Sequence, residues 1–537
     1  MKEVRWYVGM GLAVATSLLL LFSFPTFNVN AFGFIALIPV FFLTYTSRLK
    51  KALIYGILSG FLFYCLYLFW MNAYLAMVGV AFVTIVYGGY FAIALLLINV
   101  AGRAIPKYRV FLTAFIWIAV EYVKGFGFLG LTFGSIGYTQ HNFLRFIQIA
   151  DIGGEPLVSF IIVLFNAAVA HMCALIYERK METIFRKGVL PLYISVGLIL
   201  FSLIYGSVRL REPIPTSPSM RLSLIQSLSS PRTEWKEDKW NTLNRLINLT
   251  VESNDAYPEA DLVVWTETAI RTSLRPNLIY GSAYHMRIQR MIKALNTSFI
   301  IGSPDNYILN REGEIPEDSL EKIYPMKGEE EVWTNSAYYL NGSGEIIDKY
   351  DKIQLTPFGE HFPLGKHLPF LQKILDKFTD SAGFTPGSEY TVFQSGQFKF
   401  GVVICWEGTY GYLIRRFIQN HADFIINISN DMWSQTDAGH FQHFTITKFR
   451  SIEHRIWFAR AANDGVTAFI NPHGQVVKIL PIKEVGFISG EIGPKVRSTL
   501  YTRFGDVLPK IGLAVLIASF LFSLFLLVKK PSWMKKI

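Results

Sequence analysis

The sequence predicts a polytopic α-helical membrane domain of about eight spans joined to a polar domain of the α/β or layered α+β class. Hydrophobic residues make up 51% of the 537 residues and charged residues only 17%, well below the roughly one quarter of a soluble chain. Apolar runs of spanning length fill the first 208 residues and recur once near the C-terminus. Between them, short β-rich runs alternate with polar helical stretches. This composition excludes a disordered chain, a collagen-like fibre and a small disulfide scaffold.

Eight apolar segments define the predicted membrane helices. A bilayer core requires about 20 residues of helix, and most segments reach this length, although 31–46 and 110–124 are shorter. The complete set lies near 7–24, 31–46, 52–75, 76–101, 110–124, 156–177, 189–208 and 507–528. The predicted domains are therefore a seven-helix membrane domain over 1–208, an outer α/β domain over 209–506, and a last helix with a basic tail over 507–537.

Basic residues beside the spans predict the orientation of the chain. One set of alternate flanks contains 16 Lys and Arg side chains, whereas the opposite flanks contain only Lys124, Arg145 and Lys510. Because positive flanks stay in the cytoplasm, both termini are predicted to be cytoplasmic and residues 209–506 to lie outside. In a bacterium this outer side is the periplasm. A cleavable signal peptide is the alternative for the first segment, but the next span follows almost at once, which favours an uncleaved helix.

The net charge of +11 does not form a surface for nucleic acid. Residues 209–506 contain 32 Lys+Arg against 34 Asp+Glu, a balance of −2, so the remaining residues carry +13. The polar domain therefore lacks the basic surface that phosphate binding needs, and we expect no nucleic-acid partner. Three cysteines far apart in the chain do not make a disulfide framework. Cys65 and Cys173 lie in apolar runs, so Cys405 is the only cysteine in polar sequence.

Three reactive side chains stand close to β-rich runs of the polar domain. Glu267 comes just beyond the strand predicted at 262–265, and Cys405 ends the apolar run 401–404 before a helical pattern resumes. Lys352 lies in a charged hairpin that continues into Pro-Phe-Gly-Glu. Taken singly, each residue also fits a structural role: a surface carboxylate, a solvated lysine and a buried thiol. A turn at the end of a strand would expose the thiol and place backbone N–H groups near it.

Together the three side chains supply the groups that nucleophilic catalysis by a cysteine requires. A thiol with its ordinary pKa of about 8.5 is mostly protonated at neutral pH, so a nucleophilic cysteine needs a base or a nearby cation. Glu267 can take the proton of Cys405. Lys352 can stabilise the thiolate and then the oxyanion of a tetrahedral intermediate.

The ordered set Glu267, Lys352 and Cys405 resembles the nitrilase (carbon–nitrogen hydrolase) superfamily, which implies a four-layer α-β-β-α sandwich. With its flanking spans, the chain is similar to the apolipoprotein N-acyltransferase family. The matching pieces are 117–121, 137–140, Gln226, Trp235, 265–267, 352–360, 405–407, 429–433, 442–443 and 463–467. The sequence departs from the family at 433–435 (Trp-Ser-Gln for Trp-Phe-Gly), at Trp406 (for Tyr) and at 227–230. None of these departures removes a catalytic group.

The resemblance implies a bacterial inner-membrane enzyme that acylates lipoproteins in two steps. Cys405 would take an acyl chain from a phospholipid, with phosphatidylethanolamine the expected donor, as a thioester. The α-amine of a diacylglyceryl apolipoprotein would then accept the chain. Glu267 is the implied base and Lys352 the electrostatic stabiliser. Supporting residues are Glu360 and Glu407, which would orient the lysine and the nucleophile, and Trp235, Phe358 and Trp406. Structural salt bridges are the alternative for Glu360 and Glu407.

No metal or other cofactor is implied, because the histidines of the polar domain have no ligand spacing. Among these, His443 is expected to hydrogen-bond within the domain rather than act as a base. Residues 368–379 fit an amphipathic helix at the membrane interface, and we interpret them as a lid that admits an acyl chain. Packing of this segment against the domain's own core is the alternative.

Two other functions compete with acyl transfer. A membrane-tethered amidase of the nitrilase type would let water resolve the thioester, but it would need a soluble substrate and would have little use for eight spans. A transporter or receptor would use the outer domain only to bind a ligand. The spans contain few polar residues and no pair of charges that marks a path through the membrane, which disfavours transport.

Overall fold

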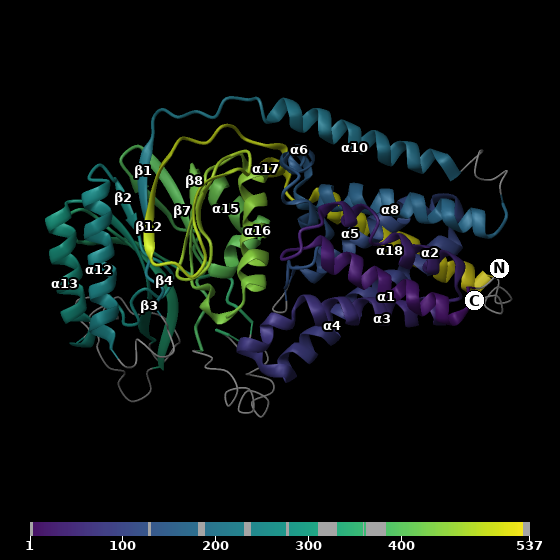
Figure 1. The fold of residues 1–537 in the computed structure, drawn as a ribbon, viewed down its shortest axis with the longest axis horizontal. Coiled ribbons are helices and arrows are strands. Elements are labelled where there is room, and N and C mark those ends of the chain that lie inside the picture. The colour runs from purple at the N-terminus through teal and green to yellow at the C-terminus, as the bar shows by residue number, and fades with distance from the viewer. Residues whose placement is uncertain are drawn as a thin grey trace. The chain divides into compact units, whose positions relative to one another are not determined.

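The chain divides into two compact units, Met1–Glu212 with Thr499–Ile537 and Pro213–Ser498. Their fold is known from a computed structural model (Figure 1). The structure describes residues 4–126, 130–180, 188–229, 238–274, 279–309, 330–357, 359–360 and 383–529.

The first unit is a bundle of apolar helices (Figure 1). The longer ones are α1 (Trp6–Ser23), α2 (Ile38–Thr46), α3 (Leu49–Tyr67), α4 (Asn72–Ala104), α5 (Arg109–Lys124), α8 (Glu155–Tyr177), α10 (Val189–Arg209) and α18 (Val507–Lys529). Short helices are α6 (Leu144–Ile147), α7 (Ala150–Gly153) and α17 (Leu500–Phe504). Among the described residues, six helices are long and apolar enough to cross a membrane: α1, α3, α4, α8, α10 and α18. A polytopic helical domain is thus confirmed, while the predicted eight spans were approximate, since α2 and α5 have only 9 and 16 residues.

Small residues allow two of these helices to approach closely. Gly56 and Gly60 are four residues apart on α3 and face α4. A Cβ atom at Gly56 would lie 3.1 Å from Ala92 Cα, and one at Gly60 would lie 2.7 Å from Gly88 O. This spacing of small residues is typical of tight helix pairs in membranes.

The described residues of the second unit form two six-stranded sheets. The first sheet has the order β12-β1-β2-β3-β4-β5, with parallel pairing only among β1, β2 and β3. Its strands are β1 (Met220–Gln226), β2 (Leu262–Val264), β3 (Ser298–Leu309), β4 (Glu330–Leu340), β5 (Ile346–Asp351) and β12 (Gly486–Ile492). The second sheet has the order β11-β10-β9-β8-β7-β6, with parallel pairing among β7, β8 and β9. Its strands are β6 (Val392–Ser395), β7 (Phe398–Ile404), β8 (Phe424–Ser429), β9 (Phe458–Ala462), β10 (Thr467–Ile470) and β11 (Val476–Leu480).

Helices cover the outer face of each sheet. Figure 1 shows α12 (Lys239–Ala256) and α13 (Ile279–Leu295) beside the first sheet, and α15 (Gly411–Gln419) and α16 (Asp437–His454) beside the second. The central strands β7, β8 and β9 are mostly apolar because nearly all of their positions are buried, and Asn427 and Arg460 are polar exceptions inside them. The layers are therefore helix, sheet, sheet and helix, which confirms the predicted α-β-β-α sandwich.

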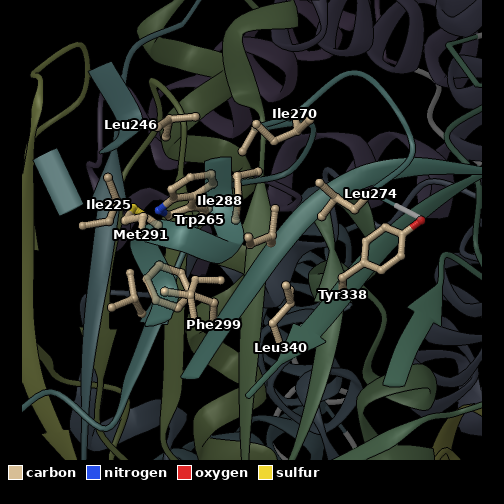
Figure 2. Close-up of a cluster of buried hydrophobic side chains, with 14 of the residues drawn as sticks. Ile225, Leu246, Trp265, Ile270, Leu274, Ile288, Met291, Phe299, Tyr338 and Leu340 are labelled. Atoms are coloured by element: carbon tan, nitrogen blue, oxygen red, sulfur yellow. The ribbon is translucent and has the colours of Figure 1, made fainter. Parts of the chain in front are cut away.

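An apolar cluster fixes the first sheet to its helices. Leu246 of α12 and Ile292 of α13 pack against Trp265 and Phe299, all buried from solvent (Figure 2 labels most of the cluster). Trp265 Nε1 also donates to Thr250 Oγ1 at 2.9 Å, so the indole has one fixed orientation. This packing holds the chain just before Glu267, since Trp265 lies two residues upstream.

We predict that Ile292→Ala lowers the stability of this unit by about 2–5 kcal/mol, because the truncation leaves a cavity between α13 and the sheet. The matched control is Ile479→Ala on β11, where the side chain is 50% exposed and its loss leaves no cavity. Thermal unfolding of the full chain in detergent would show a lower midpoint for Ile292→Ala only. Equal midpoints for the two variants would contradict the role of this cluster.

Candidate active site

The structure places Glu267, Lys352 and Cys405 at or just beyond the ends of strands. Glu267 follows β2 by three residues, Lys352 directly follows β5, and Cys405 directly follows β7. The first two belong to one sheet and Cys405 to the other. Both β2 and β7 are interior strands with parallel neighbours, β2 on both sides and β7 on the side of β8. Side chains beyond the carboxyl ends of parallel strands commonly form sites.

A buried ammonium group lies between two carboxylates at this position. Lys352 Nζ is 2.8 Å from Glu360 Oε2 and 3.5 Å from Glu267 Oε1. Lys352 is only 1% exposed. Asn335 Nδ2 donates to Glu267 Oε1 at 2.9 Å and to Glu360 Oε1 at 2.6 Å, so one amide group joins the two carboxylates.

The charges of this cluster move its pKa values in opposite directions. Burial lowers the pKa of Lys352, but the carboxylates of Glu360 and Glu267 raise it more, so the lysine stays protonated. Burial raises the pKa of Glu267 above its ordinary value, with Lys352 opposing and Glu360 adding to the rise. Burial also raises the pKa of Glu360, but Lys352 and the backbone N–H of Thr356 bring it below its ordinary value. Of the two carboxylates beside Lys352, Glu267 is therefore the better proton acceptor.

Cys405 stands at a turn with an unusual backbone conformation. It begins the short 3₁₀ helix η7 (Cys405–Thr409) with φ of +54°, in the left-handed region. Its side chain is only partly exposed. Burial and the charge of Glu267 raise the pKa of the thiol well above its ordinary value, while Lys352 lowers it. The resting thiol is thus protonated, and attack on a substrate requires a base.

Glu407, two residues after the cysteine, connects the two sheets. Its Oε1 accepts hydrogen bonds from Tyr350 OH and from the backbone N–H groups of Ile353 and Gln354, all at 2.8–2.9 Å. Its Oε2 accepts from Ile404 N at 2.8 Å. The carboxylate therefore connects the turn at the end of β7 to the loop that follows Lys352.

A second link between the sheets involves a residue of the matching piece 429–433 to which the sequence analysis assigned no role. Asn430 follows β8, and its backbone N–H donates to Glu267 Oε2 at 2.7 Å. Asn335, which bridges Glu267 and Glu360, was also missed. An asparagine inside the β-rich run 330–340 is uncommon in a strand, and this was the only sequence signal for it.

The remaining predicted residues have different positions. Trp406 is buried, and its Nε1 donates to Tyr410 OH at 2.8 Å. Trp235, Phe358 and the lid segment 368–379 lie outside the described residues. Within the described ranges, no group of three or more His, Cys, Asp or Glu side chains is arranged to hold a metal ion.

Two family models match the chain, one in each part. The model described as carbon–nitrogen hydrolase matches residues 221–501, so the chain belongs to the carbon–nitrogen hydrolase family. The model described as apolipoprotein N-acyltransferase N-terminal domain matches residues 16–168.

The similarity to curated proteins extends over nearly the whole chain. Apolipoprotein N-acyltransferase 1 of Treponema denticola is 29% identical, over 97% of this chain and 97% of that protein. Apolipoprotein N-acyltransferase of Geobacter metallireducens is 28% identical, over 92% of this chain and 91% of that protein. A solved amidase from Nesterenkonia sp. is 16% identical, with a TM-score of 0.36, over 53% of this chain and 94% of that chain. The family models and the two curated relatives confirm the predicted resemblance to apolipoprotein N-acyltransferases.

We predict that Gly302→Ala lowers the rate of the reaction at this site by about 10-fold or more, since misplacement by about 1 Å costs up to 100-fold. A Cβ atom on Gly302 of β3 would meet Thr266 O and lie 2.7 Å from Glu267 Cα, so the backbone that supports Glu267 must shift. Gly486→Ala, in the same sheet, is the control, because its nearest neighbour would be an ordinary 3.7 Å away. Equal activity of both variants would contradict this constraint.

Glu407 should also make stability depend on pH. Burial raises its pKa from 4.5 to about 7, with Lys352 and the N–H donors opposing. Between these values the folded protein binds more protons than the unfolded chain, so stability falls as pH rises from 4.5 to 7, by at most about 3 kcal/mol. Glu407→Gln should flatten the change in unfolding midpoint over this window, whereas Glu345→Gln, at a solvent-exposed carboxylate, should leave it as in the wild type. If the unfolding midpoint of Glu407→Gln changes with pH as much as that of the wild type, Glu407 is not the group responsible for the pH dependence.

Proposed function

We propose that this protein is a phospholipid-dependent N-acyltransferase that acylates the α-amine of diacylglyceryl apolipoproteins, with Glu267, Lys352 and Cys405 as its catalytic triad. One observation carries the proposal. A carbon–nitrogen hydrolase unit is combined with a unit of membrane-spanning helices, and relatives matched over nearly the full length are named apolipoprotein N-acyltransferase. A soluble amide substrate would not require the helices, whereas two lipid-anchored substrates would.

The first step transfers an acyl chain to the enzyme. Glu267 takes the proton of the Cys405 thiol as the sulfur attacks an ester carbonyl of the phospholipid. The charge on the carbonyl oxygen develops beside the ammonium group of Lys352, which stays protonated and stabilises it. The C–O bond then breaks, and the lysophospholipid hydroxyl leaves with the proton that Glu267 held. An acyl thioester on Cys405 remains.

The second step passes the acyl chain to the lipoprotein. The neutral α-amine attacks the thioester carbonyl, and Glu267 accepts a proton from the attacking nitrogen. Collapse of the intermediate breaks the C–S bond, and the cysteine recovers a proton from Glu267. The products are an amide and the resting thiol, so Glu267 ends each step as it began.

The proposal places the enzyme in the bacterial inner membrane, with both termini cytoplasmic. Residues 209–506 would form the periplasmic catalytic domain between the helices of 1–208 and the last helix and tail of 507–537. This orientation is supported by the 16 basic residues on one set of flanks. The donor and the acceptor would then both reach the site from the outer leaflet. Phosphatidylethanolamine is the proposed donor, and 368–379 the proposed lid.

Intact-mass spectrometry of the purified protein tests the two steps. With phosphatidylethanolamine in detergent, we expect one added acyl chain on the wild type and none on Cys405→Ala. A diacylglyceryl-cysteine peptide should discharge the adduct and gain the same mass. Cys65→Ala and Cys173→Ala, changes in helices of the membrane unit, are controls that should keep both activities.

Two results would contradict the proposal. An adduct that water removes at the same rate with or without the peptide would instead support an amidase-like hydrolase. No adduct and no modified peptide, with several phospholipids, would leave a binding function such as that of a receptor or transporter.

A further inference from the structure

A second cluster of buried charges lies behind the cysteine and has no part in the mechanism above. Its members are Asp431, His443 and Arg460. Asp431 follows β8, His443 lies on α16 and Arg460 lies on β9. Arg460 Nη2 is 2.5 Å from Asp431 Oδ2, and His443 Nδ1 is 2.9 Å from Asp431 Oδ1. Burial raises the pKa of Asp431, but Arg460 and His443 together hold it well below its usual range. The cluster is therefore charged, rigid and buried next to the nucleophile.

The cluster is connected to the backbone of Cys405. His443 Nε2 and Asn427 Nδ2 both lie 3.2 Å from the carbonyl oxygen of Cys405. A carbonyl oxygen can only accept, so the His443 nitrogen that faces it carries a proton. Two side-chain donors thus hold one peptide oxygen at the reactive turn.

One guanidinium group orients both donors. Arg460 donates through Nη1 to Asn427 Oδ1, which leaves the amide nitrogen of Asn427 facing the carbonyl oxygens of Val403 and Cys405. Through Nη2 it holds Asp431, whose other oxygen contacts His443 Nδ1. The orientation of His443 therefore follows from the Arg460–Asp431 pair.

We propose that His443, held by Asp431 and Arg460, is a positioning residue for acylation of Cys405. The inference rests on the proposed role of Cys405 as the nucleophile. A peptide group is planar, and in its trans form the C=O and the following N–H point in opposite directions. Fixing the Cys405 carbonyl therefore also fixes the direction of the Trp406 N–H. It also helps to hold Cys405 at its left-handed φ of +54°, a conformation that is unfavourable for a cysteine. Fixed donors at the nucleophile stabilise the oxyanion of an acyl transfer.

The test separates attack on a carbonyl from reactivity of the thiol. Acylation of the full-length protein by p-nitrophenyl butyrate forms an oxyanion, whereas alkylation of Cys405 by iodoacetamide does not. His443→Leu should slow the acylation burst by about 30-fold, less than the loss of an oxyanion donor itself, with KM changed less than about 3-fold. Alkylation of Cys405, followed by peptide mass spectrometry, should stay within about 3-fold of the wild type, because positioning does not act on thiolate formation.

Two further variants separate positioning from a merely structural role. His443→Gln keeps a nitrogen donor at about the same reach and should restore the burst to within about 5-fold of the wild type. His454→Gln changes another buried histidine of the same helix and should keep the full burst rate. An equal loss in His454→Gln, or no recovery in His443→Gln, would overturn the inference.

The remaining outcomes are equally decisive. If alkylation falls together with acylation, His443 acts on the thiol itself and the positioning role is wrong. A wild-type burst with the short ester but no transfer from phospholipid to peptide would refute the proposed function and leave the positioning role intact. Absence of any wild-type burst would overturn both.

Discussion

The buried ammonium of Lys352 is the constraint on which the rest of the site depends. A charge without access to water is costly unless opposite charge and hydrogen bonds surround it closely. Here Glu360 is in contact at 2.8 Å and Glu267 at 3.5 Å, and Asn335 donates to both carboxylates. Removing any one of these groups would leave a buried charge or a buried amide without its partner. The end of β2, the end of β5 and the loop at Thr356 must therefore meet at one point.

Buried carboxylates also join the two sheets, through hydrogen bonds that they accept from backbone N–H groups. Glu267, from the first sheet, accepts the backbone N–H of Asn430 from the second. Glu407, from the second, accepts the backbone N–H groups of Ile353 and Gln354 from the loop after β5 of the first. Each carboxylate is thus fixed by backbone N–H groups that follow strands of the opposite sheet, and these bonds hold the turn at Cys405 and the loop after Lys352 in one relative position. Hydrogen bonds to charged groups are stronger than those between neutral groups, so carboxylates are well suited to join the two sheets.

Local patterns in the sequence explain which parts could be predicted. Apolar strands that end in Glu267 and Cys405 are visible in the chain because burial on both faces requires continuous apolar runs. The partners of Glu407 were not visible, because Ile353 and Gln354 contact it through backbone atoms more than 50 positions away. Every residue type except proline has a backbone N–H, so no sequence pattern marks this bond.

The membrane unit shows the same limit. Hydropathy located its helices, but it placed a boundary at 75–76, whereas the chain turns at Phe69–Met71 and α4 begins at Asn72. Both sides of that turn are apolar, so composition alone has no signal there. Buried networks such as Asp431 with Arg460 are hidden for a related reason. Their members come from separate strands and helices, and only the fold brings them together.

The arrangement of carboxylates also decides which group can move protons in the proposed reaction. Lys352 stays protonated because two carboxylates raise its pKa, so it cannot serve as the base. Glu360 has a lowered pKa and a contact with Lys352, which makes it a weak acceptor. Glu407 already accepts four hydrogen bonds within the fold. Glu267 has a raised pKa, and its charge reaches the Cys405 thiol. The proton of the thiol, and later that of the amine, therefore has one suitable acceptor among these groups, and this supports a single base for both steps.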